Sequence, residues 1–205
     1  YARKDVADVY AYAKKNGFEG SELMPWDFSY WSEKYQQAEY SLSAEELKPY
    51  FQLESCIDAV LGLATRLYGI TFKELDNVPV YHEDVKVYEV NDADGRHLAL
   101  FYADFFPRAS KRGGAWMTEF RGQSIRNGVE YRPFISTVMN FTKPTADAPA
   151  LITHDELTTF LHEFGHALHG IFAEGRYGSL TGTNVSRDFV ELPSQIMENW
   201  AFEPE

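Results

Sequence analysis

A helix-like stretch near the C-terminal end of the chain carries the pattern that most restricts its fold. His162, Glu163 and His166 spell His-Glu-x-x-His. In an α-helix, side chains four positions apart lie one turn apart on the same face. Two neutral imidazoles in this arrangement can hold one metal ion, while the glutamate between them acts as general base toward water. The spacing therefore predicts an active-site helix with one Zn2+ per chain, His162 and His166 as metal ligands and Glu163 as the catalytic base.

The surrounding residues predict where this helix begins and how its faces differ. Thr153 and Glu156 have capping-box spacing, so the helix is expected to begin here. At about 100° per residue, one face collects the apolar side chains Leu157, Phe160, Leu161, Phe164, Leu168 and Ile171. The opposite face collects His162, His166 and His169. We interpret His169 as a histidine that lines a cleft or faces solvent. Four small residues flank the histidines and are expected to leave room for a metal and a substrate: Thr158, Thr159, Gly165 and Gly170.

A catalytic zinc usually has a third protein ligand and leaves its fourth position to water. The downstream candidates are Glu174, Asp188, Glu191 and Glu198. Segment 175–187 is rich in Gly, Ser, Thr and Asn, which predicts a loop that lets the chain return to the first helix. Asp188 could then cap a second helix with Glu191 in its first turn. We favour Glu191 as the ligand, although spacing alone leaves Asp188 open. Glu198 or Asp188 is a candidate for orienting an imidazole.

The rest of the chain is helical first and strand-rich afterwards. Apolar periodicity predicts helices over 3–16, 28–39 and 53–68. Alternating patterns predict strands over 85–90, 98–105 and 134–141. Together these elements predict one α+β unit, mainly helical, with a small and mostly antiparallel sheet. We interpret strand 134–141 in two ways: as an edge strand that pairs with extended substrate along the cleft, or as an ordinary structural strand.

Composition excludes several classes of function. The net charge of -12 argues against binding to nucleic acid or to anionic membranes. Cys56 is the single cysteine, so no disulfide forms within the chain, which suits a reducing, cytoplasmic compartment. No apolar run is long enough to span a bilayer. The chain does not begin with Met and stops soon after an apparent helix, so we expect a fragment cut at both ends, with a monomer favoured.

Several runs of residues carry a family resemblance. Three lie near the C-terminal end: His162-Glu163-Phe164-Gly165-His166-Ala167-Leu168-His169-Gly170, Ser179-Leu180-Thr181-Gly182-Thr183-Asn184 and Arg187-Asp188-Phe189-Val190-Glu191-Leu192-Pro193-Ser194-Gln195. Others lie upstream: Pro25-Trp26-Asp27, Lys48-Pro49-Tyr50-Phe51, Arg66-Leu67-Tyr68-Gly69, Gly113-Gly114-Ala115-Trp116 and Asn140-Phe141-Thr142-Lys143-Pro144. Together they resemble the thimet oligopeptidase–neurolysin family of zinc metallopeptidases, most closely its bacterial peptidyl-dipeptidase or oligopeptidase A branch.

This resemblance implies more than the spacing does. It implies a zincin-like catalytic region that cuts short peptides in a channel between two largely helical halves, with residues 1–205 as part of the catalytic domain. It also implies Glu191 as the third zinc ligand and, for the dipeptidase branch, release of C-terminal dipeptides. Asn140 lies in a matching run and joins Asp188, Glu198 and His169 as a candidate for orienting a ligand or contacting substrate. Family members are far longer, and a histidine and tyrosines that contact their substrate lie beyond the end of this chain.

We therefore expect a zinc metallopeptidase that hydrolyses peptide bonds in short oligopeptides. In this interpretation Glu163 takes a proton from water and passes it to the leaving amine. Two alternatives stay open. One is a catalytic-domain fragment that binds metal but is inactive, and the other is a non-enzymatic helical interaction module in which Glu163 is a surface charge.

Overall fold

The computed structural model describes residues 2–41 and 44–203, and its contacts divide the chain into two compact units, Tyr1–Leu47 and Lys48–Glu205. The first unit contains α1 (Ala2–Lys15), α2 (Pro25–Tyr40) and the short α3 (Ala44–Leu47). Aromatic rings hold α1 to α2, with ring centroids of Tyr12 and Tyr35 5.6 Å apart. We expected a single unit. The separation arises because these aromatic side chains give α1 and α2 contacts of their own, which periodicity does not reveal.

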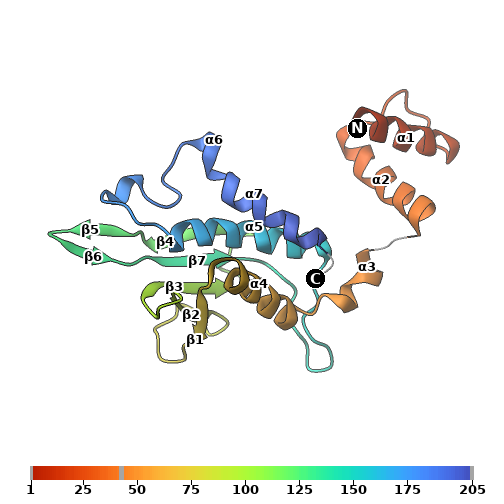
Figure 1. Ribbon diagram of the computed structural model, residues 1–205. Helices are drawn as coiled ribbons and strands as arrows, with labels where there is room; N and C mark the ends of the chain where they lie inside the picture. Colours follow the sequence, from red (N-terminus) through yellow and green to blue (C-terminus); the bar gives the residue numbers. More distant parts are fainter. Residues whose placement is uncertain (1, 42–43, 204–205) are drawn as a thin grey trace. The chain divides into compact units, whose positions relative to one another are not determined.

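The second unit is built on a mixed five-stranded sheet (Figure 1). Its strands are β1 (Thr71–Glu74), β2 (Lys86–Asn91), β3 (His97–Asp104), β4 (Trp116–Arg121) and β7 (Phe134–Val138). The order across the sheet is β1-β2-β3-β7-β4, with β3 and β7 parallel and the other neighbours antiparallel. A separate hairpin consists of β5 (Ser124–Arg126) and β6 (Val129–Tyr131). The small sheet was predicted, whereas its one parallel pairing was not.

Strand β4, and not β7, lies at the edge of the sheet. Strand β7 is interior, because Ile135 pairs with Phe101 of β3 on one side and with Glu119 of β4 on the other. The interpretation of 134–141 as an edge strand is therefore wrong, and the structural alternative holds. Strand β4 was not predicted, because five of its six residues are half-buried and the strand lacks a clean alternation of apolar and polar positions.

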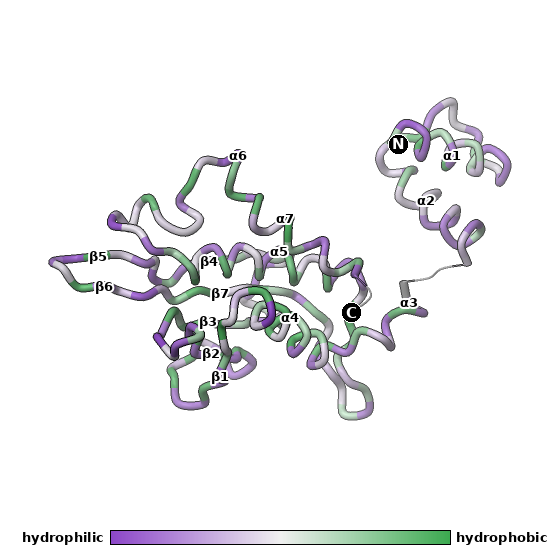
Figure 2. The backbone as a smooth tube through the Cα atoms, viewed as in Figure 1, coloured by the Kyte–Doolittle hydropathy of each residue, from purple (hydrophilic) through white to green (hydrophobic). Residues whose placement is uncertain are grey.

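Two helices bury their apolar faces in the main core, α4 (Leu53–Tyr68) and α5 (His154–Ile171). The ring of Phe164 in α5 lies 5.5 Å from that of Phe101 in β3 and 6.0 Å from that of Phe72 in β1. Hydrophobic and hydrophilic residues recur along α5 in Figure 2, as expected of a helix with one buried face. The predicted apolar face is confirmed, since Leu157 alone among its six residues is only partly buried.

Helix α5 begins with the capping box that its sequence predicts. The Thr153 Oγ1 atom accepts the Glu156 amide at 3.1 Å, and the Glu156 carboxylate accepts the Thr153 amide at 2.7 Å. Asp155 adds a second negative charge in the first turn, where the helix dipole favours it. The start of the helix is therefore fixed by local sequence.

The end of α5 is held by an arginine from outside the helix. The Arg132 guanidinium donates to the carbonyls of Ile171 at 2.8 Å and Ala173 at 3.0 Å. It also donates to the Leu98 carbonyl of β3 at 2.8 Å. Because the last carbonyls of a helix have no partner within it, Arg132 satisfies them and ties the helix end to the sheet.

The residues after α5 return along it. A short 3-10 helix, η2 (Gly178–Leu180), is followed by α6 (Arg187–Val190), α7 (Leu192–Glu198) and η3 (Asn199–Phe202). Elsewhere in this unit, a further 3-10 helix, η1 (Lys48–Tyr50), precedes α4. Helix α7 lies alongside α5 (Figure 1). The predicted returning helix is present, but Glu191 occupies the junction of α6 and α7 instead of a helical turn.

Among the residues that the structure describes, no helix has both the length and the apolar character needed to cross a bilayer.

The loop between α5 and α6 is held beside the sheet by polar contacts. The Gly175 amide donates to Gln123 Oε1 at 3.0 Å, and the Thr181 hydroxyl donates to the Gln123 carbonyl at 3.0 Å. Gln123 is 1% exposed, so these bonds anchor the loop beside the sheet.

Replacing Arg132 with methionine should lower the free energy of unfolding by about 2–3 kcal/mol, because three carbonyls lose a charged donor. Thermal unfolding followed by circular dichroism measures the change. Arg126→Met is the matched control, because Arg126 is exposed at the end of β5, and it should alter stability by less than about 0.5 kcal/mol. Equal losses in the two variants would contradict the role of Arg132 at the helix end.

Candidate metal centre

Three side chains from two parts of the chain converge beside α5. His162 and His166 come from consecutive turns of α5, and Glu191 comes from the junction of α6 and α7. The Glu191 Oε2 atom lies 3.1 Å from His166 Nε2 and 3.4 Å from His162 Nε2. One ligand atom from each residue lies within 4.8 Å of the others. No second group of three such side chains occurs within residues 2–41 and 44–203.

The donors and spacing of this cluster fit a zinc ion. Protein zinc sites bind imidazole nitrogen and carboxylate oxygen at about 2.0–2.2 Å in a tetrahedral arrangement, which separates the ligand atoms by about 3.3–3.6 Å. The two separations between histidine and glutamate atoms, 3.1 and 3.4 Å, are close to this range. Three protein donors also leave a fourth position for water. The cluster can therefore hold a divalent cation.

Glu198 fixes the ring of His162. Its Oε1 atom lies 2.6 Å from His162 Nδ1. When Nδ1 donates to this carboxylate, the neutral imidazole leaves its Nε2 atom unprotonated and able to bind a metal. The sequence left this position open between Glu198 and Asp188. The structure brings Glu198 to the imidazole, whereas Asp188 is exposed on α6 and lies outside the cluster.

Ser194 supports Glu191 and was not predicted. Its Oγ atom is 2.8 Å from Glu191 Oε2 and 2.9 Å from the Glu191 carbonyl oxygen. This hydrogen bond is the main cause that holds the pKa of Glu191 below its ordinary value, and the nearby His166 and His162 add to the effect. A serine three residues after a glutamate at a helix start is the sequence signal that could have indicated this contact.

Glu163 lies beside the cluster and is 8% exposed. Burial raises the pKa of its carboxyl group, while the charge of His162 and a hydrogen bond from the Met117 amide of β4 act in the opposite sense. Burial also lowers the pKa of His166, which favours the neutral imidazole that a metal requires. A buried carboxyl group near the His162 imidazole and the Glu191 carboxylate has the environment of a proton-transfer group.

The glycines that flank the histidines do not leave the open space predicted for a metal and a substrate. A Cβ atom at Gly165 would lie 2.5 Å from the Pro193 carbonyl oxygen beside α5. One at Gly170 would lie 2.7 Å from Ile135 Cδ1 of β7. Neighbouring elements fill both spaces. For these two residues the prediction is wrong, because the missing side chains permit close packing.

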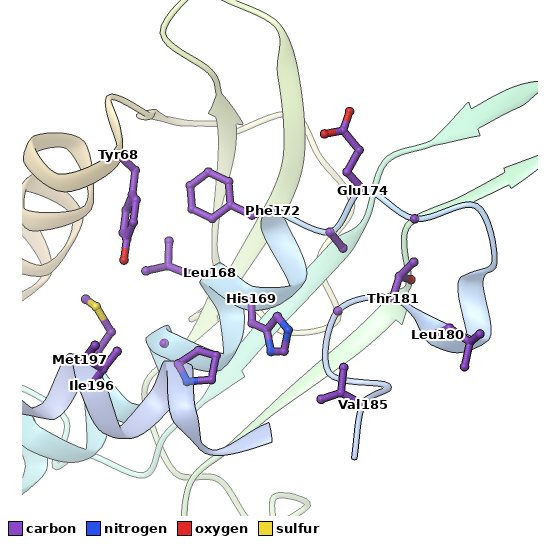
Figure 3. Close-up of a pocket in the computed structure, with 15 residues that line it drawn as sticks. Tyr68, Leu168, His169, Phe172, Glu174, Leu180, Thr181, Val185, Ile196 and Met197 are labelled. Carbon is purple, nitrogen blue, oxygen red and sulfur yellow. The ribbon is translucent and has the colours of Figure 1, made fainter. Parts of the chain in front are cut away.

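His169 lines a separate cavity of about 390 Å³ between the end of α5, α7 and the loop that follows α5 (Figure 3). It projects from α5 toward the loop that carries Thr181 and Val185 (Figure 3). Its ring lies 6.1 Å from that of Phe189, and burial lowers its pKa. His169 therefore belongs to a cavity wall and stands outside the cluster of three ligand atoms.

Asn140 also stands outside the cluster and holds a loop. Its Nδ2 atom donates to the carbonyls of Arg112 at 3.0 Å and Gly114 at 2.6 Å. These carbonyls immediately precede β4, whose Met117 amide donates to Glu163. By holding the loop that leads into β4, Asn140 helps to place the strand whose Met117 amide contacts Glu163.

Comparison with known proteins relates these features to one group of enzymes. The sequence pattern of Peptidase family M3 matches residues 1–205. A dipeptidyl carboxypeptidase from Salmonella typhimurium is 50% identical over 186 residues, which cover 90% of this chain and 27% of that protein. Oligopeptidase A from Escherichia coli is 43% identical over 204 residues, 98% of this chain and 30% of that protein. A thimet-like oligopeptidase from Dictyostelium discoideum is 38% identical over 167 residues, 80% of this chain and 25% of that protein.

These matches confirm the resemblance carried by the sequence runs. The chain spans 25–30% of the length of these three curated relatives. The family pattern, in contrast, extends over every residue of the chain. On that match, the chain belongs to Peptidase family M3.

Proposed function

We propose that this chain carries the catalytic centre of a zinc metallopeptidase that hydrolyses peptide bonds in short peptides. The observation that carries the proposal is the convergence of His162, His166 and Glu191 beside the buried carboxyl group of Glu163. Membership of Peptidase family M3 supports the class of reaction. Zinc is the proposed metal because imidazole and carboxylate are its usual ligands and because the spacing fits it.

The residues of the cluster have distinct roles in this proposal. When bound, zinc supplies a Lewis acid that polarises the scissile carbonyl and lowers the pKa of water. His162 and His166 present their Nε2 lone pairs, and Glu198 holds the His162 ring through Nδ1. Ser194 orients the Glu191 carboxylate and favours its ionised form.

Glu163 moves the proton. Its carboxylate accepts a proton from the attacking water and passes it to the leaving amine. Because burial raises the pKa of Glu163, the protonated form that this transfer requires costs less than it would in water. A hydrogen bond from the Met117 amide lowers the pKa of the same carboxyl group and so opposes part of the effect of burial.

In this proposal, the substrate peptide binds along the exposed edge of strand β4. This strand is the last strand of the sheet within the described residues, and an extended peptide can add to such an edge through main-chain hydrogen bonds. Met117 of β4 contacts Glu163. A peptide on this edge would therefore run past the group that moves the proton.

A second candidate function is metal binding without hydrolysis. The chain spans 27% of the length of its dipeptidyl carboxypeptidase relative, so the groups that contact substrate in such a protein need not all be here. A zinc-loaded protein that fails to cleave any short peptide would favour this candidate over the peptidase.

Removing any one of the three proposed donors should lower zinc affinity by more than about 100-fold, beyond the range of about 10–100-fold for a residue that only orients a ligand. The variants are His162→Ala, His166→Ala and Glu191→Ala, measured by competition with a chelator of known affinity. Asp188→Ala is the matched control, because Asp188 is an exposed carboxylate on the preceding turn. Absence of zinc from the wild-type protein, or an equal loss in Asp188→Ala, would overturn the ligand assignment.

Glu163→Gln should keep zinc and lower kcat by about 10²–10⁴-fold, because the amide cannot accept the proton. Hydrolysis of a quenched fluorescent peptide measures the rate, and metal analysis of the same sample measures the zinc. Glu174→Gln is the control, since Glu174 is exposed beyond the end of α5. Full activity in Glu163→Gln would remove this residue from the mechanism.

Release of dipeptides from peptide C-termini is the finer proposal. The proposal is supported by the 50% identity between this chain and the dipeptidyl carboxypeptidase from Salmonella typhimurium. Paired peptides with a free and an amidated C-terminus test it, with products identified by mass spectrometry. We expect loss of two residues from the free peptide and little cleavage of the amidated one. Equal internal cleavage of both peptides would instead indicate an endopeptidase.

A further inference from the structure

We propose that Gly165 is a positioning residue that brings Glu191 within reach of His162 and His166. It acts by letting the chain at the start of α7 approach the backbone of α5 more closely than any side chain would permit. This inference rests on the proposed function, because it concerns the same metal centre. It adds a residue that neither the ligand pattern nor the family match assigns to that centre.

The contact at Gly165 is between backbones. A Cβ atom at this position would lie 2.5 Å from the Pro193 carbonyl oxygen, 2.6 Å from Ser194 Cα and 3.0 Å from the Pro193 carbonyl carbon. Real Cβ atoms essentially never come within 3.0 Å of a heavy atom from a distant part of the chain, so α7 would have to retreat by about 0.5 Å. Backbone atoms cannot turn aside as the end of a flexible side chain can.

The backbone that meets Gly165 also holds the ligand. Ser194 is fully buried, and its hydroxyl lies 2.8 Å from Glu191 Oε2. Pro193 follows Glu191 by two residues in the same turn of chain. A shift of this segment therefore carries the carboxylate with it. Since Glu191 Oε2 lies only 3.1 and 3.4 Å from the two imidazoles, a retreat of this size changes the fit of the donors to one ion.

The two other glycines inside α-helices, Gly62 and Gly170, lack this backbone contact. A Cβ atom at Gly62 of α4 would meet nothing within 4 Å. One at Gly170 would meet the ends of the flexible side chains of Ile135 and Met117. Glycine is disfavoured inside helices, and at Gly165 the close approach of α7 offsets that disadvantage.

The test compares Gly165→Ala with Gly62→Ala, which adds the same methyl group to a helix with open space around it. Zinc affinity is measured by chelator competition, and the visible spectrum of the cobalt-substituted protein reports the donor set. We expect Gly165→Ala to lose about 10–100-fold in zinc affinity, as for other residues that orient a ligand, and to change the cobalt spectrum. Gly62→Ala should match the wild type in both measurements. Equal zinc affinity in the two variants would refute the proposal.

A double-mutant cycle with Glu191→Ala separates positioning from general damage. If Gly165 acts through Glu191, adding Gly165→Ala to Glu191→Ala should cause little further loss of zinc affinity. A full additional loss would show that Gly165 acts elsewhere and would overturn the inference. If Gly165→Ala does not unfold cooperatively, Ser194→Thr replaces it in the cycle, because it adds a methyl group to the same interface and keeps the hydroxyl.

Failure of the proposed function gives a different result. If the wild-type protein binds no zinc, the metal centre itself is refuted, and the positioning role falls with it. If the wild type binds zinc and Gly165→Ala binds it equally well, the metal centre stands and the positioning role is refuted. Amide exchange over α7 in the zinc-free proteins adds an independent measure, and we expect faster exchange in Gly165→Ala than in Gly62→Ala.

Discussion

Burial of one face of α5 determines the direction in which His162 and His166 point. Phe160, Phe164 and Ile171 are each 0% exposed on the opposite face. Fully burying one such side chain contributes about 1.5–3 kcal/mol, so a rotation of the helix that exposed them would cost several times that amount. The imidazoles are therefore aimed by hydrophobic packing behind them. The capping box at one end and Arg132 at the other then fix the helix along its axis.

Charge at the centre complements this packing. Three carboxyl groups, those of Glu163, Glu191 and Glu198, gather around the imidazoles of His162 and His166. Like charges held close together repel, and a divalent cation between them offsets that repulsion. These carboxyl groups also bring many hydrogen-bond acceptors into a small space, so each one is paired with a hydrogen-bond donor. Glu191 has Ser194, Glu163 has the Met117 amide, and Glu198 has an imidazole N–H.

The sequence predicted the features whose signals are local. The capping box at Thr153, the apolar face of α5 and the histidine pair all follow from spacing within one helix. Glu191 was favoured as the third member from its expected place in the first turn of a returning helix, but spacing did not separate it from Asp188, and only the family resemblance decided between the two. The structure brings Glu191 into the cluster and leaves Asp188 exposed.

Features that depend on distant residues were missed or misread. Strand β4 has little alternation of its own, and it becomes a strand because β7 offers it a partner. Gly165 was expected to make room for a ligand, whereas the atoms that fill its space come from Pro193 and Ser194. The division of the chain into two units likewise depends on contacts between α1 and α2 that no periodicity encodes.

The position of Glu191 outside α5 has a consequence for the stability of the whole segment. A cation shared by His166 and Glu191 would act as a reversible crosslink that closes a loop of 24 intervening residues. Closing that loop restricts the unfolded chain, and binding to the folded state adds stability that grows with the concentration of free metal. The order of the loop between α5 and α6 would then be tied to metal supply, so that one ion serves both the chemistry and the fold.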